Sequence, residues 1–118
     1  MKEIPTGQDL EDLILEYAQF VAEDERLCKL MLRREEIAYD DPIEARDIQV
    51  ELNWASYEYG KEKGFEGGPY GPLIGPLKLA QDVVHSMLKG EINDLTSEET
   101  RQFIQQEIKD HSSFYGIK

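Results

Sequence analysis

The sequence has few of the residues that build disulfides, membrane spans and metal sites. Its 118 residues include one cysteine, Cys28, and two histidines, His85 and His111. A single cysteine excludes an internal disulfide and favours a reducing compartment. The longest apolar runs are about three residues, whereas a transmembrane helix needs about twenty. The first residues, MKEIPTGQDLED, lack the apolar stretch of a secretory signal. We therefore expect a cytoplasmic protein that does not enter a membrane.

Basic residues are also scarce. Lys and Arg number 13 against 25 Asp and Glu, a net charge of −12. Residues 1–66 hold 18 acids and 8 bases, while residues 67–118 hold 7 and 5. Direct binding to a nucleic acid or an anionic membrane requires a basic face, so we do not expect it. A protein partner with a basic patch fits this charge better. The alternative is that the charge only keeps the protein soluble.

Apolar residues recur at helical spacing along most of the chain. Residues 8–38 contain neither glycine nor proline, which predicts one long helix with a kink or a short loop near 22–26. Asp41, Pro42 and Glu44 form a helix start, and that helix should run to about residue 62. Pro76 begins a third predicted helix, and the sequence TSEE at 96–99 caps a fourth.

These helices predict an all-α protein, a small bundle of about four helices. No segment alternates with period two for long enough to form a strand. We expect a single domain over residues 1–118, since this length supports one hydrophobic core. It would comprise an acidic helical pair at 7–62, a Gly/Pro-rich loop at 63–75 and a second helical pair at 76–113.

The predicted helix after Pro42 carries two apolar stripes on nearly opposite sides. The first stripe contains Ile43, Val50, Trp54 and Tyr57. The second stripe contains Ile48, Leu52, Ala55 and Tyr59. A helix that is apolar on two sides is usually sandwiched in a core or covered by a partner. A second copy of the chain is one candidate partner, which would make the protein a homo-oligomer.

An acidic stripe lies between the two apolar stripes. Its members are Glu44, Asp47, Glu51, Glu58 and Glu62. Docking to a basic protein is one interpretation of this stripe, and mimicry of a nucleic-acid backbone, as in a phage-type inhibitor, is another. A third is ligation of Mg²⁺ or Mn²⁺, which carboxylates suit. The commonest explanation of such a stripe is a solvated helix face.

The metal hypothesis concerns one class of enzyme. Glu35 and Glu36 are followed by Glu44 and Asp47 at ExxD spacing. This pattern resembles the carboxylates of all-α nucleotide pyrophosphohydrolases of the MazG type, and the resemblance implies a nucleotide hydrolase that uses Mg²⁺ or Mn²⁺. The sequence lacks the clean ExxE that should precede them, and Pro42 places Glu44 in a first helical turn. We therefore assign no family.

Residues 60–76, GKEKGFEGGPYGPLIGP, depart from the helical pattern for longest. They contain six of the nine glycines and three of the five prolines. Neither GxxxxGK[ST] nor GxGxxG is present, so a phosphate-binding loop has no support. Long irregular loops are often functional, and this one carries four apolar side chains: Phe65, Tyr70, Leu73 and Ile74. They form either the edge of a binding surface or a lid on the core, unless the segment is only a mobile linker.

The remaining reactive residues form no catalytic constellation. We expect His85 to be exposed, and Cys28 lies on an apolar face without a neighbouring base. We therefore expect no catalytic residue, no metal site and no cofactor. The sequence favours a non-enzymatic protein that binds and regulates or inhibits another protein through the acidic stripe and the apolar loop residues. The metal enzyme and the nucleic-acid mimic remain the alternatives.

Overall fold

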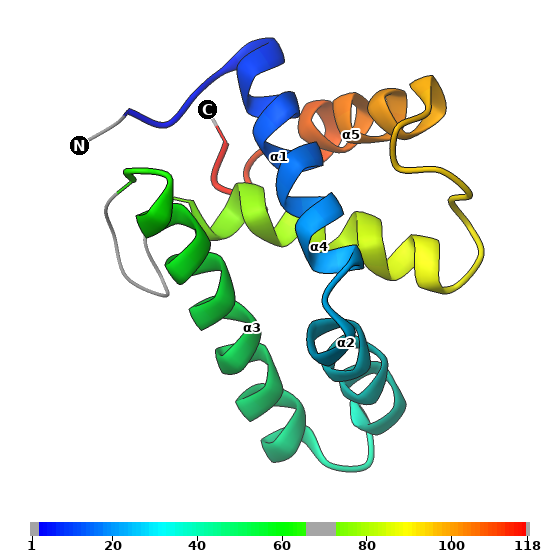
Figure 1. Cartoon of the computed structure of the whole chain (residues 1–118). Helices are drawn as coiled ribbons and strands as arrows, with labels where there is room; N and C mark the ends of the chain where they lie inside the picture. The colour runs from blue at the N-terminus through cyan, green and yellow to red at the C-terminus, as the bar shows by residue number, and fades with distance from the viewer. Residues whose placement is uncertain (1–2, 66–72, 118) are drawn as a thin grey trace.

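The computed structural model describes residues 3–65 and 73–117, and these fold entirely as helices and turns. Five helices follow one another along the chain (Figure 1). They are α1 (Gly7–Ala22), α2 (Glu25–Ile37), α3 (Pro42–Glu62), α4 (Ile74–Leu88) and α5 (Glu98–His111). The prediction of an all-helical fold is confirmed. The described part of the chain has five helices rather than about four, because the first predicted helix is divided.

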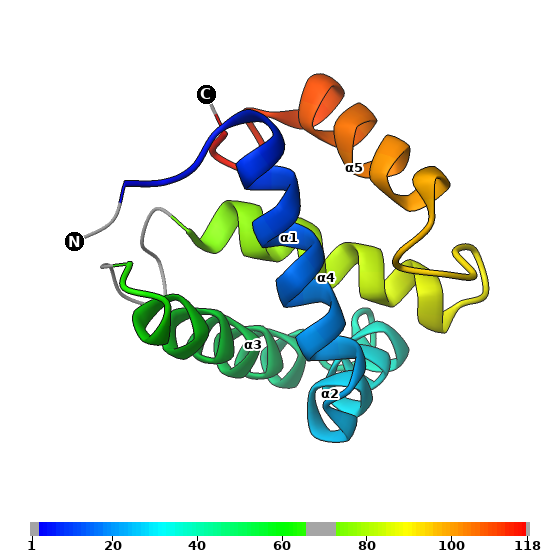
Figure 2. The same cartoon turned by 45° about the horizontal axis from the view of Figure 1, so that its top comes forward.

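The division between α1 and α2 falls at Glu23 and Asp24. Asp24 has extended backbone angles, and its Oδ1 accepts a hydrogen bond from the Leu27 N–H at 3.0 Å. This is the geometry of a helix N-cap, and it satisfies one of the N–H groups that a new helix leaves unpaired. The break falls within the expected 22–26 segment, and it separates two helices instead of bending one long helix. Asp24 starts a second helix, whose axis turns away from α1 (Figure 2).

Helices α2 and α3 form an antiparallel hairpin (Figure 1). The turn between them ends at Asp41, whose Oδ1 accepts a hydrogen bond from the Glu44 N–H at 3.0 Å. Pro42 occupies the first turn of α3, where its missing N–H costs nothing. The start of α3 therefore lies where the sequence predicts it. Between the helices, Arg34 donates a hydrogen bond to Gln49.

Helix α4 is the centre of the fold. It contacts all four of the other helices, and Figure 2 shows α1 crossing it while α3 and α5 lie on either side. Most of its length is therefore buried, as the following residues show: Pro76, Leu77, Leu79, Ala80, Gln81, Val83 and Val84. The helix begins at Ile74, two residues before the expected Pro76.

A buried polar network joins α1, α3 and α4. The Tyr17 hydroxyl lies 3.1 Å from the Ser56 Oγ, and Gln81 Nε2 donates to the same Oγ at 2.9 Å. Gln81 Nε2 also lies 3.2 Å from the backbone carbonyl of Leu52. All three polar side chains are buried. Such bonds stabilise one arrangement of the three helices, because a shifted helix would leave buried polar groups unpaired.

The C-terminal segment after α5 packs against α4. Tyr115 is buried, and its hydroxyl donates a hydrogen bond to Asp82 Oδ2 at 3.0 Å. Burial, and then the neighbouring carboxylate of Asp82, raise the pKa of the Tyr115 phenol. The two ends of the described chain consequently lie on the same side of the fold (Figure 1).

Candidate protein-binding surface

The acidic stripe lies on the open side of α3. Asp47, Glu51, Glu58 and Glu62 are exposed, and Glu44 is partly exposed. Helix α3 packs mainly against α2 and α4, so its remaining surface faces solvent (Figure 1). The structure therefore brings the five carboxylates that the sequence singled out onto one accessible helix.

The five carboxylates differ in their ionic partners. Glu44 lies 3.5 Å from Arg33, and Glu51 lies 3.4 Å from Arg26, so α2 supplies both partners. These pairs are exposed, and exposed pairs contribute little to stability. Within the part of the chain that the structure describes, Asp47, Glu58 and Glu62 have no base at ion-pair distance. Their negative charge is available to a partner.

The two apolar stripes of α3 have different environments. Ile48, Leu52 and Tyr59 of the second stripe are buried in the core. In the first stripe, the Ile43 side chain is 66% exposed and the Trp54 side chain is 46% exposed. Trp54 packs edge-on against Tyr57 with 5.4 Å between ring centroids.

We call one group of exposed residues on this helix the outer α3 face. It consists of Ile43, Asp47, Glu51, Trp54, Glu58 and Glu62, and the exposed bases Arg46 and Lys61 belong to the same helix. Ile43 and Trp54 were not among the site residues predicted from the sequence, although their stripe was. Helical spacing placed them beside the acids, and only the packing of α3 shows that this stripe is the one left in solvent.

The apolar residues of the predicted binding loop belong largely to the core. Phe65 is partly buried against the core cluster, and only 8% of Leu73 is exposed. Ile74 is partly buried at the start of α4, and Tyr70 lies outside the described residues. Phe65 and Leu73 therefore contribute to the lid on the core and leave little surface for a partner. The described loop residues are apolar and at least partly buried, whereas the acids of α3 are charged and mostly exposed.

Glu35, one of the carboxylates of the metal hypothesis, is engaged by two bases. Glu35 Oε2 lies 2.7 Å from His85 Nε2, and its Oε1 lies 3.2 Å from Lys89 Nζ. These hydrogen bonds, His85 first and Lys89 second, lower the pKa of Glu35. Among the described residues, no three His, Cys, Asp or Glu side chains are placed to hold a metal ion.

The ion pair of Glu35 also corrects one expectation. The sequence predicted an exposed His85 that points away from the core. Its side chain is only 19% exposed, and it joins α4 to α2 through Glu35. The helical wheel of α4 showed that His85 lies off the main apolar face. It could not show that α2 covers that side as well.

No family model matches the sequence, and no significant match was found to a curated protein or to a solved structure. The function must therefore be argued from the residues themselves. One further finding bears on where they can act: across 3–65 and 73–117, no helix combines the length and the apolar character needed to cross a bilayer.

Proposed function

We propose that this chain is a non-enzymatic binding protein that regulates or inhibits another protein through the outer α3 face. One observation carries the proposal: a half-exposed Trp54 lies on the same helix surface as exposed carboxylates without ionic partners. Tryptophan is enriched among the residues that dominate interface energies. A monomer has no need to leave it in solvent between charged residues.

The partner should carry a basic patch with an apolar recess. The chain has a net charge of −12, and such a field steers a basic protein towards it and accelerates encounter. Asp47, Glu58 and Glu62 would meet Lys or Arg side chains at the rim. Trp54 and Ile43 would then bury their apolar surface in the recess, which supplies most of the affinity.

A nucleic-acid-binding protein is one partner with such a patch. From Asp47 to Glu58 the helix rises by roughly 17 Å, at about 1.5 Å per residue. The exposed carboxylates therefore form a row of negative charge, which is the feature that supports the phage-type inhibitor hypothesis. On this version of the proposal, the protein would compete with DNA or RNA for the partner.

The test starts from partners captured with the purified protein and identified by cross-linking and mass spectrometry. The affinity of each partner is then measured for the triple variant Asp47→Asn/Glu58→Gln/Glu62→Gln. Its matched control, Glu98→Gln/Glu99→Gln/Asp110→Asn, removes the same charge from exposed positions of α5. We expect weaker and less salt-dependent binding only for the α3 variant. Equal affinities of the two variants would overturn the proposal.

Trp54→Ala tests the apolar part separately. We expect at least a tenfold loss of affinity, since truncating a hot-spot aromatic typically costs about 2 kcal/mol or more. Light scattering on the same samples addresses self-association. If the wild type is a dimer that Trp54→Ala converts into a monomer, the outer α3 face is an interface between copies, and the proposal of a basic partner is wrong.

A further inference from the structure

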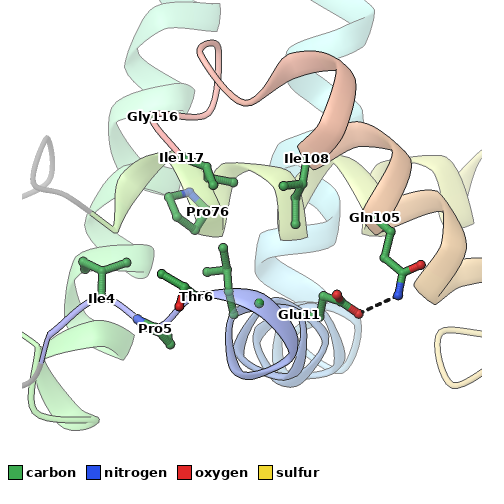
Figure 3. A pocket seen from close by; sticks show the side chains of 11 residues that line it. Ile4, Pro5, Thr6, Glu11, Pro76, Gln105, Ile108, Gly116 and Ile117 are labelled. Carbon is green, nitrogen blue, oxygen red and sulfur yellow. Dashed lines mark hydrogen bonds between the residues drawn. The ribbon is translucent and has the colours of Figure 1, made fainter.

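A cavity of about 470 Å³ lies between α1, α4, α5 and the C-terminal segment (Figure 3). Its lining residues come from four segments: the residues before and within the first turns of α1, the start of α4, the end of α5 and the C-terminal segment. Among them, Leu10 and Pro76 are buried, while Thr6, Gln105 and Gly116 are exposed. The cavity therefore opens to solvent.

The walls of the cavity are mainly aliphatic. Ile4, Pro5, Leu10, Ile108 and Ile117 contribute apolar surface. Protein interiors seldom contain voids larger than a water molecule, and ligand sites typically measure about 300–1,000 Å³ with apolar walls and a few fixed polar groups. This cavity has the size and composition of a ligand site rather than of a packing defect.

The polar groups of the cavity are fixed by hydrogen bonds. Glu11 Oε1 accepts from Gln105 Nε2 at 2.9 Å and from Arg101 Nη1 at 3.1 Å. Figure 3 shows Glu11 and Gln105 together at one end of the cavity, opposite Ile4 and Pro5. Both hydrogen bonds end on Oε1. Within the described residues, Glu11 Oε2 is therefore still able to accept a hydrogen bond from a ligand. Only 15% of the Glu11 side chain is exposed.

The charge of this end is negative. Arg101 also pairs with Asp12 at 2.9 Å, so the two carboxylates share one guanidinium, and the cluster carries about one negative charge in excess. The lining residues that the structure describes include no Lys or Arg. Arg101, the base that pairs with Glu11, is not among the lining residues, so an anionic ligand would lie beside the carboxylate without a basic partner of its own, whereas an ammonium group would be attracted to it.

We propose that this cavity binds a small aliphatic amine. Its ammonium group would donate to Glu11 Oε2, and its hydrocarbon part would pack against Leu10, Pro76 and Ile108. Burial of that hydrocarbon removes apolar surface from water on both sides, which is the main source of affinity for a site of this kind. This inference is independent of the proposed function, since it uses no residue of the outer α3 face.

The probe is n-octylamine, titrated into ¹⁵N-labelled protein, with n-octanol and sodium octanoate as matched ligands of equal chain length. We expect saturable amide shifts at the lining residues for octylamine, weaker binding of octanol, and at least tenfold weaker binding of octanoate. Octylamine shifts spread over the acidic surface, or absent, would overturn the proposal, because a cation can also bind an acidic protein without a site.

Variants separate the head group from the cavity. Glu11→Gln should remove the preference for octylamine over octanol while octanol still binds. Asp12→Asn is the matched control, because it loses the other ion pair of Arg101 but does not line the cavity. It should keep the preference. If Asp12→Asn and Glu11→Gln behave alike, Glu11 is not the recognition group and the proposal is wrong.

Filling the cavity should abolish binding of all three ligands. Ile108→Trp places an indole in the cavity from α5. Ile117→Trp does the same from the C-terminal segment, which lies outside the five helices. Either variant with unchanged circular dichroism should lose octylamine binding. Retained binding in both would show that the ligand lies elsewhere.

Discussion

Gly75 packs so closely against the backbone of Tyr115 that a Cβ atom on the glycine would lie 1.6 Å from the Tyr115 carbonyl oxygen. That distance is far below any van der Waals contact. The first turn of α4 and the C-terminal segment therefore fit together only because position 75 has no side chain. The hydrogen bond from the Tyr115 hydroxyl to Asp82 attaches the same C-terminal segment to α4 more than one helical turn beyond Gly75.

Gly75→Ala should destabilise the protein by about 1–3 kcal/mol, the usual cost of overpacking a rigid backbone contact. Gly60→Ala is the matched control within α3. Among the described residues, its new methyl group would meet the Leu73 Cδ1 alone, at 3.0 Å, and a helical alanine gains up to about 1 kcal/mol over glycine. Urea unfolding of both variants is the measurement. Similar midpoints for the two would show that the Gly75–Tyr115 contact is not tight.

Asp24→Ala should cost about 1 kcal/mol of unfolding free energy, since it removes the side-chain cap of α2. Thr6→Ala is a useful comparison. Thr6 occupies the N-cap of α1 but its side chain makes no capping hydrogen bond, so this substitution should cost less. The two values come from denaturant unfolding monitored by circular dichroism at 222 nm. A larger loss of unfolding free energy for Thr6→Ala than for Asp24→Ala would contradict the role of Asp24 as the cap of α2.

Tyr17→Phe should destabilise the core by about 1 kcal/mol, because it removes one hydrogen bond of the buried network but leaves Gln81 bound to Ser56. Tyr39→Phe removes the same hydroxyl from a side chain that is 99% exposed, and it should have almost no effect. Thermal unfolding of the pair isolates the buried bond. Equal unfolding temperatures would mean that the Tyr17 hydroxyl contributes nothing net.

The pairing of Glu35 with His85 and Lys89 should make stability depend on pH. The folded state lowers the pKa of the Glu35 carboxyl, so folding favours its ionised form. The resulting stability is present above the ordinary carboxyl pKa of about 4.3 and is lost as pH falls through the lower, folded value. Wild type should therefore melt above Glu35→Gln at pH 6, and the gap should narrow as the pH falls through the lowered folded pKa.

Glu36→Gln provides the comparison for this pH series. Within residues 3–65 and 73–117, Glu36 pairs with Arg33 of its own helix alone, at 3.7 Å, so its loss does not separate α2 from α4. Melting curves of the three proteins between pH 3 and pH 7 complete the measurement. A gap for Glu35→Gln that grows as the pH falls would have the wrong sign and would exclude this role for Glu35.

Local sequence signals predicted most helix ends, and tertiary packing decided the others. Asp41 with Pro42, and Ser97 before α5, cap their helices as expected. A kink or a short loop was expected near 22–26, but the start of a new helix at Asp24 was not, because its neighbours also tolerate a continuous helix and the spacing of apolar residues does not show a single capping bond. His85 was misplaced because its partner, Glu35, is 50 residues away in the chain.

The candidate surface was predictable in outline only. Helical spacing put the acids of α3 on one face, and the structure keeps them there. Helical spacing could not decide which apolar stripe enters the core. Ile48 and Ile43 are the same residue type, and they differ only in what packs against them. The cavity had no signal at all, since residues from four separate segments build it and none forms a motif.

Ile4 and Ile117 line the same cavity, so the described chain nearly closes on itself. The connectivity of the helices can therefore be pictured as a ring whose two ends meet at the cavity. The exposed turn at Tyr39 and Asp40 offers a place to open that ring. A circular permutant joined by a short linker across the cavity mouth, and starting at Asp41, would place α3 first and α2 last around an unchanged core.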